Sequence, residues 1–450
     1  MALSPIAAGF RTGGPLRTLF ASRAGVGYGG DQGNCMDIDS REVRITAQGL
    51  VLGMYVSRLD RPWLETAFLM QGLKITSEDE IAMLQRVCNH VWVDVVLGTS
   101  PNPRFIAFAE PADVRQNRAA AEVDALRATT WARQLGVQDE LRQAEAVHAS
   151  LEASIDEVMT DLHNGKRLDL ERLKDGVESM IDSILRNPTA FVWLKEMKRR
   201  DNYAYQHAMG CAIWAATFGR HLGLERAELQ LLALGGLLCD VGKTRLSTEL
   251  LNKRTPLTSE EVERVHQHVQ HGLEIVDSTP GLSPKIREIV ATHHERHDGS
   301  GYPWGLQGSE IPIFGRIMGI VDSYDAMTCV RPYAPSRSPH QAVNELYQQR
   351  GTLFQAELVE QFIQNCGIYP TGSLVELSNG QVAVVTDVHS LKRLRPRVML
   401  LLDADKTPLK QFRVLDLGEV ERDDAGQPLS VKNGLPTGAY GIDPVELFLH

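Results

Sequence analysis

The sequence predicts a mainly α-helical protein with a small α/β module near its N-terminus and a small β-rich appendage near its C-terminus. Three observations support this prediction. The central part of the chain is rich in segments whose apolar residues recur every three or four positions, as on one face of a helix. Strand-like runs are confined to residues 42–98 and 367–418. With 450 residues, 43% apolar and 23% charged, the chain should form several globular domains rather than one core.

The composition also limits the classes of function. The net charge of −10 argues against non-specific binding to duplex nucleic acid or anionic lipid, and no apolar run approaches the ~20 residues that span a bilayer. The six cysteines are scattered without a CxxC pair, which fits a reducing cytoplasm better than a disulfide framework. We therefore expect a cytoplasmic protein whose partners include neither duplex nucleic acid nor a membrane.

The N-terminal part of the chain is expected to contain an arm followed by a small folded module. Residues 1–41 begin with a Gly-rich stretch and are expected to be a disordered arm, with a transit peptide as the alternative interpretation. Residues 42–98 are expected to be the α/β module. There "VRITAQGLVLGMYVSRLD" and "HVWVDVVLG" have the composition of strands, and Ser77 and Glu80 have the spacing of a helix capping box.

Residues 99–200 are expected to be a linker followed by amphipathic helices. An apolar stripe recurs at helical spacing through Ala144, Val147, Leu151, Ile155, Val158 and Leu162. The stripe predicts a helix that either packs on its own chain or dimerises, so a homodimer remains an open alternative. His148 and His163 are expected on the surface of this helix.

Residues 201–366 are predicted to form the main helical domain, and the period of the pattern changes after Pro370. "SLVELSNGQVAVVTDV" contains two alternating runs around Asn379-Gly380, which is a strong hairpin signal, and "RPRVMLLLD" adds another strand. We predict a β-rich appendage at 367–418 and a loose tail at 419–450.

The histidines indicate where the chemistry lies. Eight of the fourteen fall between residues 207 and 297. Hydrolysis of a phosphodiester needs a metal that lowers the pKa of bound water, and a second metal ~4 Å away can hold the phosphate and the leaving oxygen. Such a site needs several imidazoles and a bridging carboxylate. The candidates for these imidazoles are the eight histidines between residues 207 and 297, namely His207, His221, His266, His268, His271, His293, His294 and His297.

Two acids that follow apolar runs are candidates for the carboxylate ligands. Asp240 ends the segment "LGGLLCD", where an unpaired buried carboxylate would be costly unless cations offset its charge. Lys243 lies one helical turn further on, so it can share a face with Asp240 and hold a phosphate or steer a nucleophile. Asp322, in "GIVDSYDAM", also follows an apolar run.

The segment "HHERHDGSGYP" at 293–303 closely resembles the HHExxDGxGYP signature of the HD-GYP domain family. The resemblance covers about 201–365, through "DNYAYQHAMGCA", "CDVGKTRLSTELLNKRTPLTSEE", "HVQHGLEIV" and "GLQGSEIPIFGRIMGIVDSYDAMT". It implies an all-helical HD-type catalytic domain that hydrolyses the bacterial second messenger cyclic di-GMP to pGpG, with further cleavage to GMP left open. The stretch "GMYVSRLDRPWLETAFLMQG" is similar to a domain found ahead of HD-GYP domains in proteobacterial proteins.

The resemblance implies roles for individual residues. Asp240 would bridge the metals and act in catalysis with Lys243, while Arg331 would contact phosphate. Gly301, Tyr302 and Pro303 would shape the substrate rim, which in the family is also linked to partner binding, so diguanylate cyclase (GGDEF) domains are candidate partners beside cyclic di-GMP. The implied metal ligands are His207, Asp240, His268, His293, His294 and Asp322.

The family's centres contain two or three metals, commonly iron or manganese. Tyr203 stands where members with a third metal carry a glutamate, so the resemblance implies two divalent ions, Fe or Mn.

Two positions depart from the family pattern. Cys239 replaces the histidine of the HD dyad, and Ala334 replaces a basic residue that often follows "RPY". Cys239 is either a lost ligand or a thiolate ligand, and thiolate ligation would favour zinc or ferrous iron over manganese. Three functions therefore remain open: a cyclic di-GMP phosphodiesterase, a catalytically impaired receptor or scaffold that binds cyclic di-GMP or a cyclase domain, and a hydrolase of another nucleotide.

Overall fold

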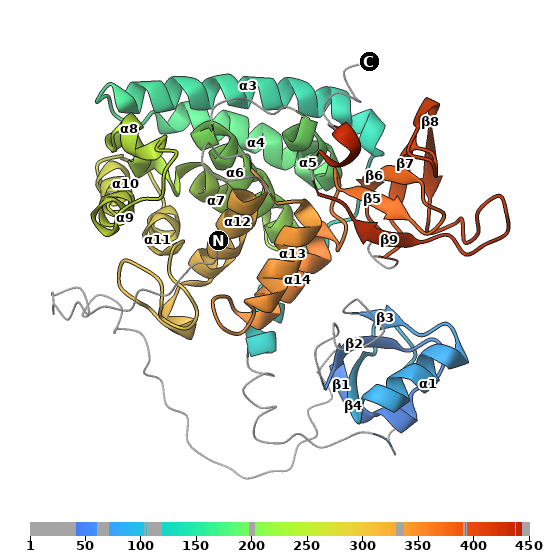
Figure 1. The fold of residues 1–450 in the computed structure, drawn as a ribbon. Helices are drawn as coiled ribbons and strands as arrows, with labels where there is room; N and C mark the ends of the chain where they lie inside the picture. Colours follow the sequence, from blue (N-terminus) through green and yellow to red (C-terminus); the bar gives the residue numbers. More distant parts are fainter. Residues whose placement is uncertain are drawn as a thin grey trace, which may run out of the picture. The chain divides into compact units, whose positions relative to one another are not determined.

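The computed structural model describes residues 42–60, 72–102, 105, 119–197, 203–329, 337–389, 392, 394–436 and 438–442. The predicted arm at 1–41 and Arg331 lie outside these residues. Within them, helices dominate and the strands form two small sheets, which confirms the mainly α class (Figure 1). The chain divides into two compact units, one containing the N-terminal sheet and the other containing everything described from residue 119 onward. None of the described helices combines the length and the hydropathy that crossing a bilayer requires.

The N-terminal unit is the predicted α/β module. Its sheet contains β1 (Glu42–Thr46), β2 (Tyr55–Leu59), β3 (Leu73–Lys74) and β4 (His90–Asp94) in the order β1-β4-β2-β3, with β4 antiparallel to β1 and β2. Helix α1 (Glu78–Val87) begins at the predicted capping box, in which the Ser77 hydroxyl accepts from the Glu80 amide and the Glu80 carboxylate accepts from the Ser77 amide. Ile81 and Leu84 are buried, so the helix covers the core with its predicted apolar face.

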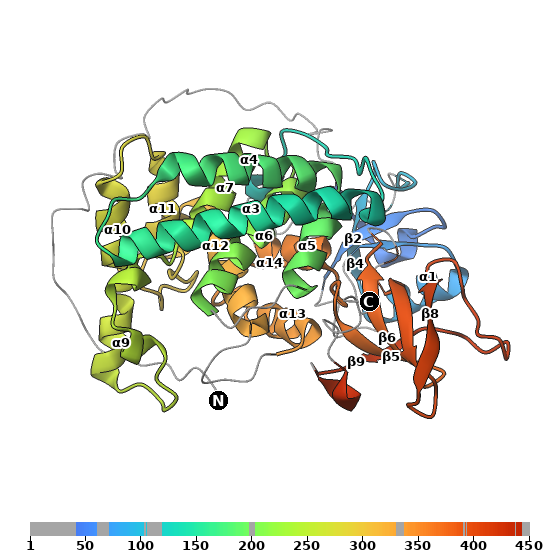
Figure 2. The same cartoon turned by 90° about the horizontal axis from the view of Figure 1, so that it is seen from above.

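Two antiparallel helices open the second unit. The predicted stripe lies on α3 (Val137–His163), which runs beside α4 (Leu170–Arg186), and both helices contact α5 (Pro188–Met197) (Figures 1 and 2). The expectation that His148 is a surface residue is wrong, since its side chain is only 3% exposed. Its ring lies between Glu152, 3.7 Å away, and Phe191 of α5, a partner that the local sequence pattern does not reveal.

The centre of the unit is made of three largely apolar helices and one amphipathic helix. The first three are α6 (Tyr203–Leu222), α7 (Arg226–Leu238) and α12 (Ile313–Thr328), and the amphipathic one is α11 (Pro284–Thr292). Helices α13 (Pro339–Gln348) and α14 (Ala356–Cys366) close one side of this core. There Trp214 meets Tyr324 edge-on at 5.0 Å, and Phe362 of α14 lies 5.1 Å from Tyr324. Such edge-to-face pairs stabilise a core beyond the apolar area they bury.

Shorter helices follow α7 in the chain. They are η5 (Val241–Arg245), α8 (Thr248–Leu251), α9 (Ser259–His266) and α10 (His268–Asp277), and α10 packs on both η5 and α11.

The C-terminal sheet contains β5 (Leu374–Leu377), β6 (Val382–Asp387), β7 (Arg397–Leu402), β8 (Pro408–Asp416) and β9 (Val431–Gly434), in the order β8-β7-β6-β5-β9. The predicted hairpin at Asn379-Gly380 joins β5 to β6, and Gly380 adopts a φ of +84°. The expectation of a loose tail at 419–450 is wrong for β9, which pairs antiparallel with β5 and forms an edge of the sheet.

Polar contacts fix this sheet to α5. The Trp193 indole donates to the carbonyl oxygen of Thr386 at 2.7 Å, and the Arg133 guanidinium reaches both the Asp387 carboxylate, at 2.7 Å, and Thr189. The β-rich appendage is therefore bound to the helix that precedes α6.

Candidate metal centre

Helix α7 brings Asp240 to the centre of the unit. Eight buried residues from Leu229 to Leu238 place α7 inside the core, and the helix ends just before Asp240, whose side chain is 11% exposed. Gly236 allows α7 to lie close to α6, because a Cβ at this position would lie 2.8 Å from the Ala212 amide nitrogen. In "LGGLLCD", the leucines bury α7 in the core and the glycines allow it to lie close to its neighbours. The aspartate that follows is thereby placed inside the unit.

Gly242, in the turn after Asp240, controls the approach of α10. A Cβ at Gly242 would lie 1.9 Å from the carbonyl oxygen of His268 and 2.4 Å from the Gly272 amide nitrogen. We expect Gly242→Ala to push α10 away, at a cost of ~1–3 kcal/mol that is typical of overpacking. Thermal unfolding measures this cost. Gly136→Ala is the matched control, because its new Cβ would meet only the flexible Asp139 carboxylate, and equal unfolding midpoints for both variants would contradict the prediction.

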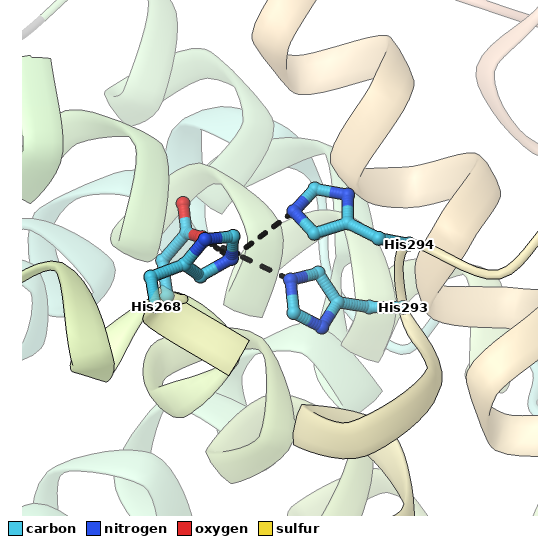
Figure 3. A group of neighbouring side chains, drawn as sticks. His268, His293 and His294 are labelled. Carbon is cyan, nitrogen blue, oxygen red and sulfur yellow. Dashed lines mark hydrogen bonds and ion pairs between the residues drawn. The ribbon is translucent and has the colours of Figure 1, made fainter. Parts of the chain in front are cut away.

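Asp240 meets three imidazoles to form the first donor cluster. Figure 3 shows the rings of His268, His293 and His294 turned toward one another. Each of these residues offers one ligand atom within 4.8 Å of those of the others and of Asp240. The Nε2 atoms of His268 and His294 lie 3.2 Å apart, and Oδ1 of Asp240 lies 3.2 Å from the His268 Nε2.

Backbone carbonyls orient two of these rings. The Nδ1 of His268 lies 2.7 Å from the Val265 carbonyl oxygen, and the Nδ1 of His293 lies 3.0 Å from that of Val290. A carbonyl oxygen only accepts, so each Nδ1 is the donor, and the neutral ring presents the Nε2 lone pair to the cluster.

The cluster suits a cation. Lone pairs on the His268 Nε2 and the Asp240 Oδ1 face each other across 3.2 Å, and this contact is repulsive unless a positive charge lies between the two atoms. The His293 Nε2 and the Asp240 Oδ1 are buried, and among the described residues neither makes a hydrogen bond. The donor set of imidazoles and a carboxylate is typical of divalent transition metals.

A second donor cluster lies beside the first. It consists of His207 and Cys211 of α6 and Asp322 of α12, whose ligand atoms lie within 4.8 Å of one another. Asp240 lies between the clusters, because its Oδ2 is 3.5 Å from the His207 Nε2 while its Oδ1 faces His268. Asp322 is likewise shared, with Oδ1 3.0 Å from the His207 Nε2 and Oδ2 3.8 Å from the His294 Nδ1.

The two carboxyl groups of the clusters, Asp240 and Asp322, are ionised near neutral pH. Burial raises the pKa of Asp240, but the adjacent Lys243 ammonium opposes this effect, and the pKa is held well below its usual range. Burial likewise raises the pKa of Asp322, and the contact with His207 overcomes it. Both acids are therefore carboxylates near neutral pH and available as ligands.

Lys243 occupies the predicted position beside Asp240. Its Nζ lies 2.5 Å from the Asp240 Oδ2, and its side chain is 23% exposed. It lies at the border between the buried clusters and solvent, where it can offset the charge of an incoming anion.

Asp325, which the sequence reasoning missed, supports His207 from behind. The Nδ1 of His207 lies 2.8 Å from the Asp325 Oδ2 and the Nε2 lies 3.0 Å from the Asp322 Oδ1, so in the neutral ring that binds a metal Nδ1 donates to Asp325 and the Nε2 lone pair faces Asp322 and Asp240. Gly210 makes room for this carboxylate, because a Cβ there would lie 2.1 Å from the Asp325 Oδ1. A carboxylate on the far nitrogen is the usual partner of a metal-binding histidine. The spacing of Asp322 and Asp325, one helical turn, was the available signal.

Lys195 of α5, also missed, lies beyond Asp325. Its Nζ is 3.1 Å from the Asp325 Oδ1 in the interior of the unit. Burial lowers the pKa of Lys195, but the Asp325 carboxylate outweighs this, so the ammonium stays charged. No local pattern identifies this residue, since it comes from a different helix.

Cys239 lies outside both donor clusters. Its side chain is buried, and its thiol donates to the Gly236 carbonyl oxygen at 3.3 Å. Cys211, which the sequence reasoning did not single out, has its sulfur in the second cluster instead. Burial raises the pKa of the Cys211 thiol well above its usual range, and contact with the Cys239 thiol raises it further.

The GYP segment forms one wall beside the histidines. The Tyr302 ring stacks on His294 at 4.6 Å and on His266 at 3.7 Å. Gly301 is required by packing, because a Cβ there would lie 2.3 Å from the Arg296 amide nitrogen.

Two acids hold this segment in place. The Glu295 carboxylate accepts from the amides of Trp304, at 2.8 Å, and Leu306, at 3.0 Å. Asp298 accepts from the Ser300 amide at 2.9 Å. These acids fix the loop, and neither belongs to a donor cluster.

The structure thus brings together His207, Asp240, Lys243, His268, His293, His294 and Asp322, with Tyr302 against His294. Arg331 and Ala334 lie outside the described residues, and so does the side chain of Tyr203.

Two adjacent His/Asp donor clusters lie buried among the helices of the second unit. This arrangement is typical of a metal-dependent phosphohydrolase. Comparison with known families identifies an HD domain at residues 190–358, a domain of unknown function (DUF3391) at 42–173 and a KOW domain associated with HD domain at 374–422. Residues 190–358 of the chain therefore form an HD domain, and residues 293–303 within it carry the HD-GYP signature.

Several curated proteins are similar to this chain. Cyclic di-GMP phosphodiesterase PA4108 of Pseudomonas aeruginosa is 29% identical over 384 residues, which cover 85% of this chain and 90% of that protein. 3'3'-cGAMP-specific phosphodiesterase 2 of Vibrio cholerae is 36% identical over 35% of this chain and 31% of its own length. Cyclic di-GMP phosphodiesterase response regulator RpfG of Xanthomonas campestris is 34% identical over 35% of this chain and 44% of its own length. The chain therefore spans less than half of the last two relatives.

Among solved structures, Bd1817, an HDG"Y"P protein from Bdellovibrio bacteriovorus, matches 71% of this chain and 98% of its own, with 15% identity and a TM-score of 0.43.

Proposed function

We propose that this protein is a metal-dependent phosphodiesterase that hydrolyses cyclic di-GMP to pGpG. The observation that carries the proposal is the position of Asp240, whose two carboxylate oxygens face two adjacent donor clusters. The named activity of a relative that matches along 85% of the chain supports the same substrate. Further cleavage of pGpG to GMP is the second step that we propose to test.

The two clusters would hold two divalent ions, with Fe or Mn as the proposed metals and Zn as the alternative if a thiolate ligates. His268, His293 and His294 would hold one ion, His207 and Asp322 the other, and Asp240 would contact both. Ions bound there would lower the pKa of the attacking water and offset phosphate charge.

The remaining residues act on the substrate. Lys243, beside Asp240 and partly exposed, would neutralise a phosphate oxygen as it enters. Gly301, Tyr302 and Pro303 would form the rim of the substrate site, because the Tyr302 ring lies against His294 of the first donor cluster. Arg331 would supply a second cation for the dianionic dinucleotide.

The test combines metal analysis with a substrate series. Anaerobically purified protein is stripped of metal, reloaded with Fe²⁺, Mn²⁺ or Zn²⁺, and assayed by chromatography with cyclic di-GMP, 3'3'-cGAMP and a dNTP. We expect metal-dependent formation of pGpG, fastest with cyclic di-GMP. A higher kcat/KM for 3'3'-cGAMP would replace the proposed substrate with the one named for the Vibrio cholerae relative.

The position of Cys239 outside both clusters motivates the receptor as the second candidate function. Wild type and Cys239→His are therefore assayed side by side. Tight binding of cyclic di-GMP without product in wild type, with turnover restored in Cys239→His, would reject hydrolysis and establish the receptor.

Cyclase (GGDEF) domains as partners, a homodimer and a cytoplasmic location complete the proposal. The GYP wall is the proposed docking surface for a cyclase domain. Co-purification with a cyclase domain tests the partner. The experiment is repeated with Trp304→Ala, because Trp304 is 46% exposed next to Pro303. Light scattering of the purified chain tests the homodimer.

A further inference from the structure

The ring of His294 is held differently from the other two rings of the first donor cluster. The rings of His268 and His293 each face a backbone carbonyl oxygen, whereas within the described part of the chain no carbonyl oxygen accepts from the ring of His294. Its Nε2 lies 3.2 Å from the His268 Nε2, and its Nδ1 lies 3.8 Å from the Asp322 Oδ2. Both neighbours are themselves members of the donor clusters, so neither provides an independent support for this ring.

A stack of three rings provides such a support. The ring of Tyr302 lies on that of His294, with centroids 4.6 Å apart and 26° between the planes. The ring of His266 lies on that of Tyr302, at 3.7 Å and 17°. Two rings at these distances and angles cannot share one face without overlapping. His266 and His294 therefore lie on opposite faces of Tyr302, which is held between them.

Backbone contacts fix both ends of the stack. His266 is the last residue of α9 and His268 the first of α10, and the Val265 carbonyl oxygen in the same turn faces the His268 Nδ1 at 2.7 Å. At the other end, the Tyr302 amide donates to the carbonyl oxygen of His294 at 3.2 Å. One turn of the chain thus orients His268 directly and reaches His294 through Tyr302.

We propose that His266 is a positioning residue of the metal centre, which holds Tyr302 against His294 and so fixes the ring of that ligand for the metal. A ligand already held in its binding orientation loses less side-chain freedom when the ion arrives. The contact is made through ring faces, so the role requires a flat ring at position 266. The inference rests on the proposed metal centre, but its test measures binding and does not require turnover.

The test compares the Zn²⁺ affinity of variants at this position. Metal-free protein is titrated with Zn²⁺ in competition with a chromogenic chelator. His266→Gln keeps a polar side chain at a half-exposed position but has no ring, and we expect it to bind Zn²⁺ ~2–10-fold more weakly, the range that corresponds to loss of one aromatic pair. His266→Phe restores a flat ring and should restore the wild-type affinity.

His271→Gln is the matched control. His271 is a partly exposed histidine of α10 whose Nδ1 lies 4.0 Å from Glu274, outside the stack, so its replacement should leave the affinity unchanged. Circular dichroism of the metal-free variants establishes that each is folded, and His266→Ala replaces His266→Gln if the latter is not. Wild-type affinity in the ring-free variant, or an affinity in His266→Phe as low as in His266→Gln, would overturn the proposal.

A double variant tests whether His266 acts through Tyr302. Tyr302→Leu alone should weaken Zn²⁺ binding, and His266→Gln in that background should have no further effect, because the intermediate ring is already missing. Losses that add in the double variant would show that His266 acts by another route and would overturn the proposal.

The outcome for the proposed function is separate. If the affinity follows the ring at position 266 but the Zn²⁺-, Fe²⁺- and Mn²⁺-loaded wild type leaves cyclic di-GMP intact, the positioning role stands and the proposed hydrolysis is rejected. Hydrolysis by a protein whose metal affinity is the same with and without the His266 ring would do the reverse.

Discussion

Asp240→Asn is expected to abolish both metal binding and hydrolysis of cyclic di-GMP. The amide keeps the size of the side chain but removes the charge and one of the two oxygens that face His268 and His207. Loss of a shared ligand affects both ions, so we expect kcat/KM to fall by at least ~10³-fold, equivalent to about 4 kcal/mol of transition-state stabilisation.

Thermal unfolding gives a readout that is independent of turnover. A metal at 100 times its Kd stabilises a folded protein by about 2.7 kcal/mol, and this stabilisation should be absent in Asp240→Asn. Asp277→Asn is the control on α10, because among the described residues the Asp277 side chain forms an exposed ion pair with Arg287 and no other. Metal-induced stabilisation and turnover that both survive in Asp240→Asn would exclude the proposed mechanism.

The second large effect is expected at Asp325, which contacts the ring of His207 and is itself in neither donor cluster. In Asp325→Asn the amide can donate to the His207 Nδ1, which allows the tautomer whose Nε2 carries the proton and no longer offers a lone pair. Loss of such a supporting carboxylate typically lowers metal affinity by ~10–100-fold. Metal titration of the stripped protein measures this change.

A double variant separates positioning from simple stability. Asp325→Asn alone removes the carboxylate 3.1 Å from the buried Lys195 ammonium, which keeps its pairing with Glu196 at 3.0 Å, so we expect a cost at or below the ~3–5 kcal/mol of a broken buried pair. Adding Lys195→Met removes this ammonium and should restore part of the unfolding free energy. If Asp325 positions His207, metal affinity stays low in the double variant. Recovery of metal affinity along with stability would show that Asp325 acts only through the ion pair.

Local patterns in the sequence predicted the elements well. The capping box at Ser77 begins α1, and the Asn379-Gly380 turn joins β5 to β6. Both are short-range signals, in which the residues that determine the structure are neighbours in the chain. The segment of β9 has no comparable signal, because its strand forms only through pairing with β5, more than fifty residues earlier.

The candidate site was predicted as far as a motif could indicate it. His293 and His294 are consecutive, so the pair is visible in the sequence, and the structure places it beside Asp240. The supporting residues have no such signal. Lys195 reaches Asp325 from a separate helix, and Cys211 looks like an ordinary apolar position on α6 until His207 and Asp322 are seen around it.

Helix α5 has a practical consequence for anyone who shortens this protein. One part of it holds the β-rich appendage through Trp193, and Lys195 on the same helix reaches the carboxylate behind His207. A polypeptide that starts at residue 201, where the sequence pattern suggests a boundary, would keep every histidine of the clusters and yet lack the ammonium that compensates Asp325. The minimal autonomous fragment for biochemistry therefore begins upstream of Pro188, and swapping the appendage between homologous proteins should be done together with α5.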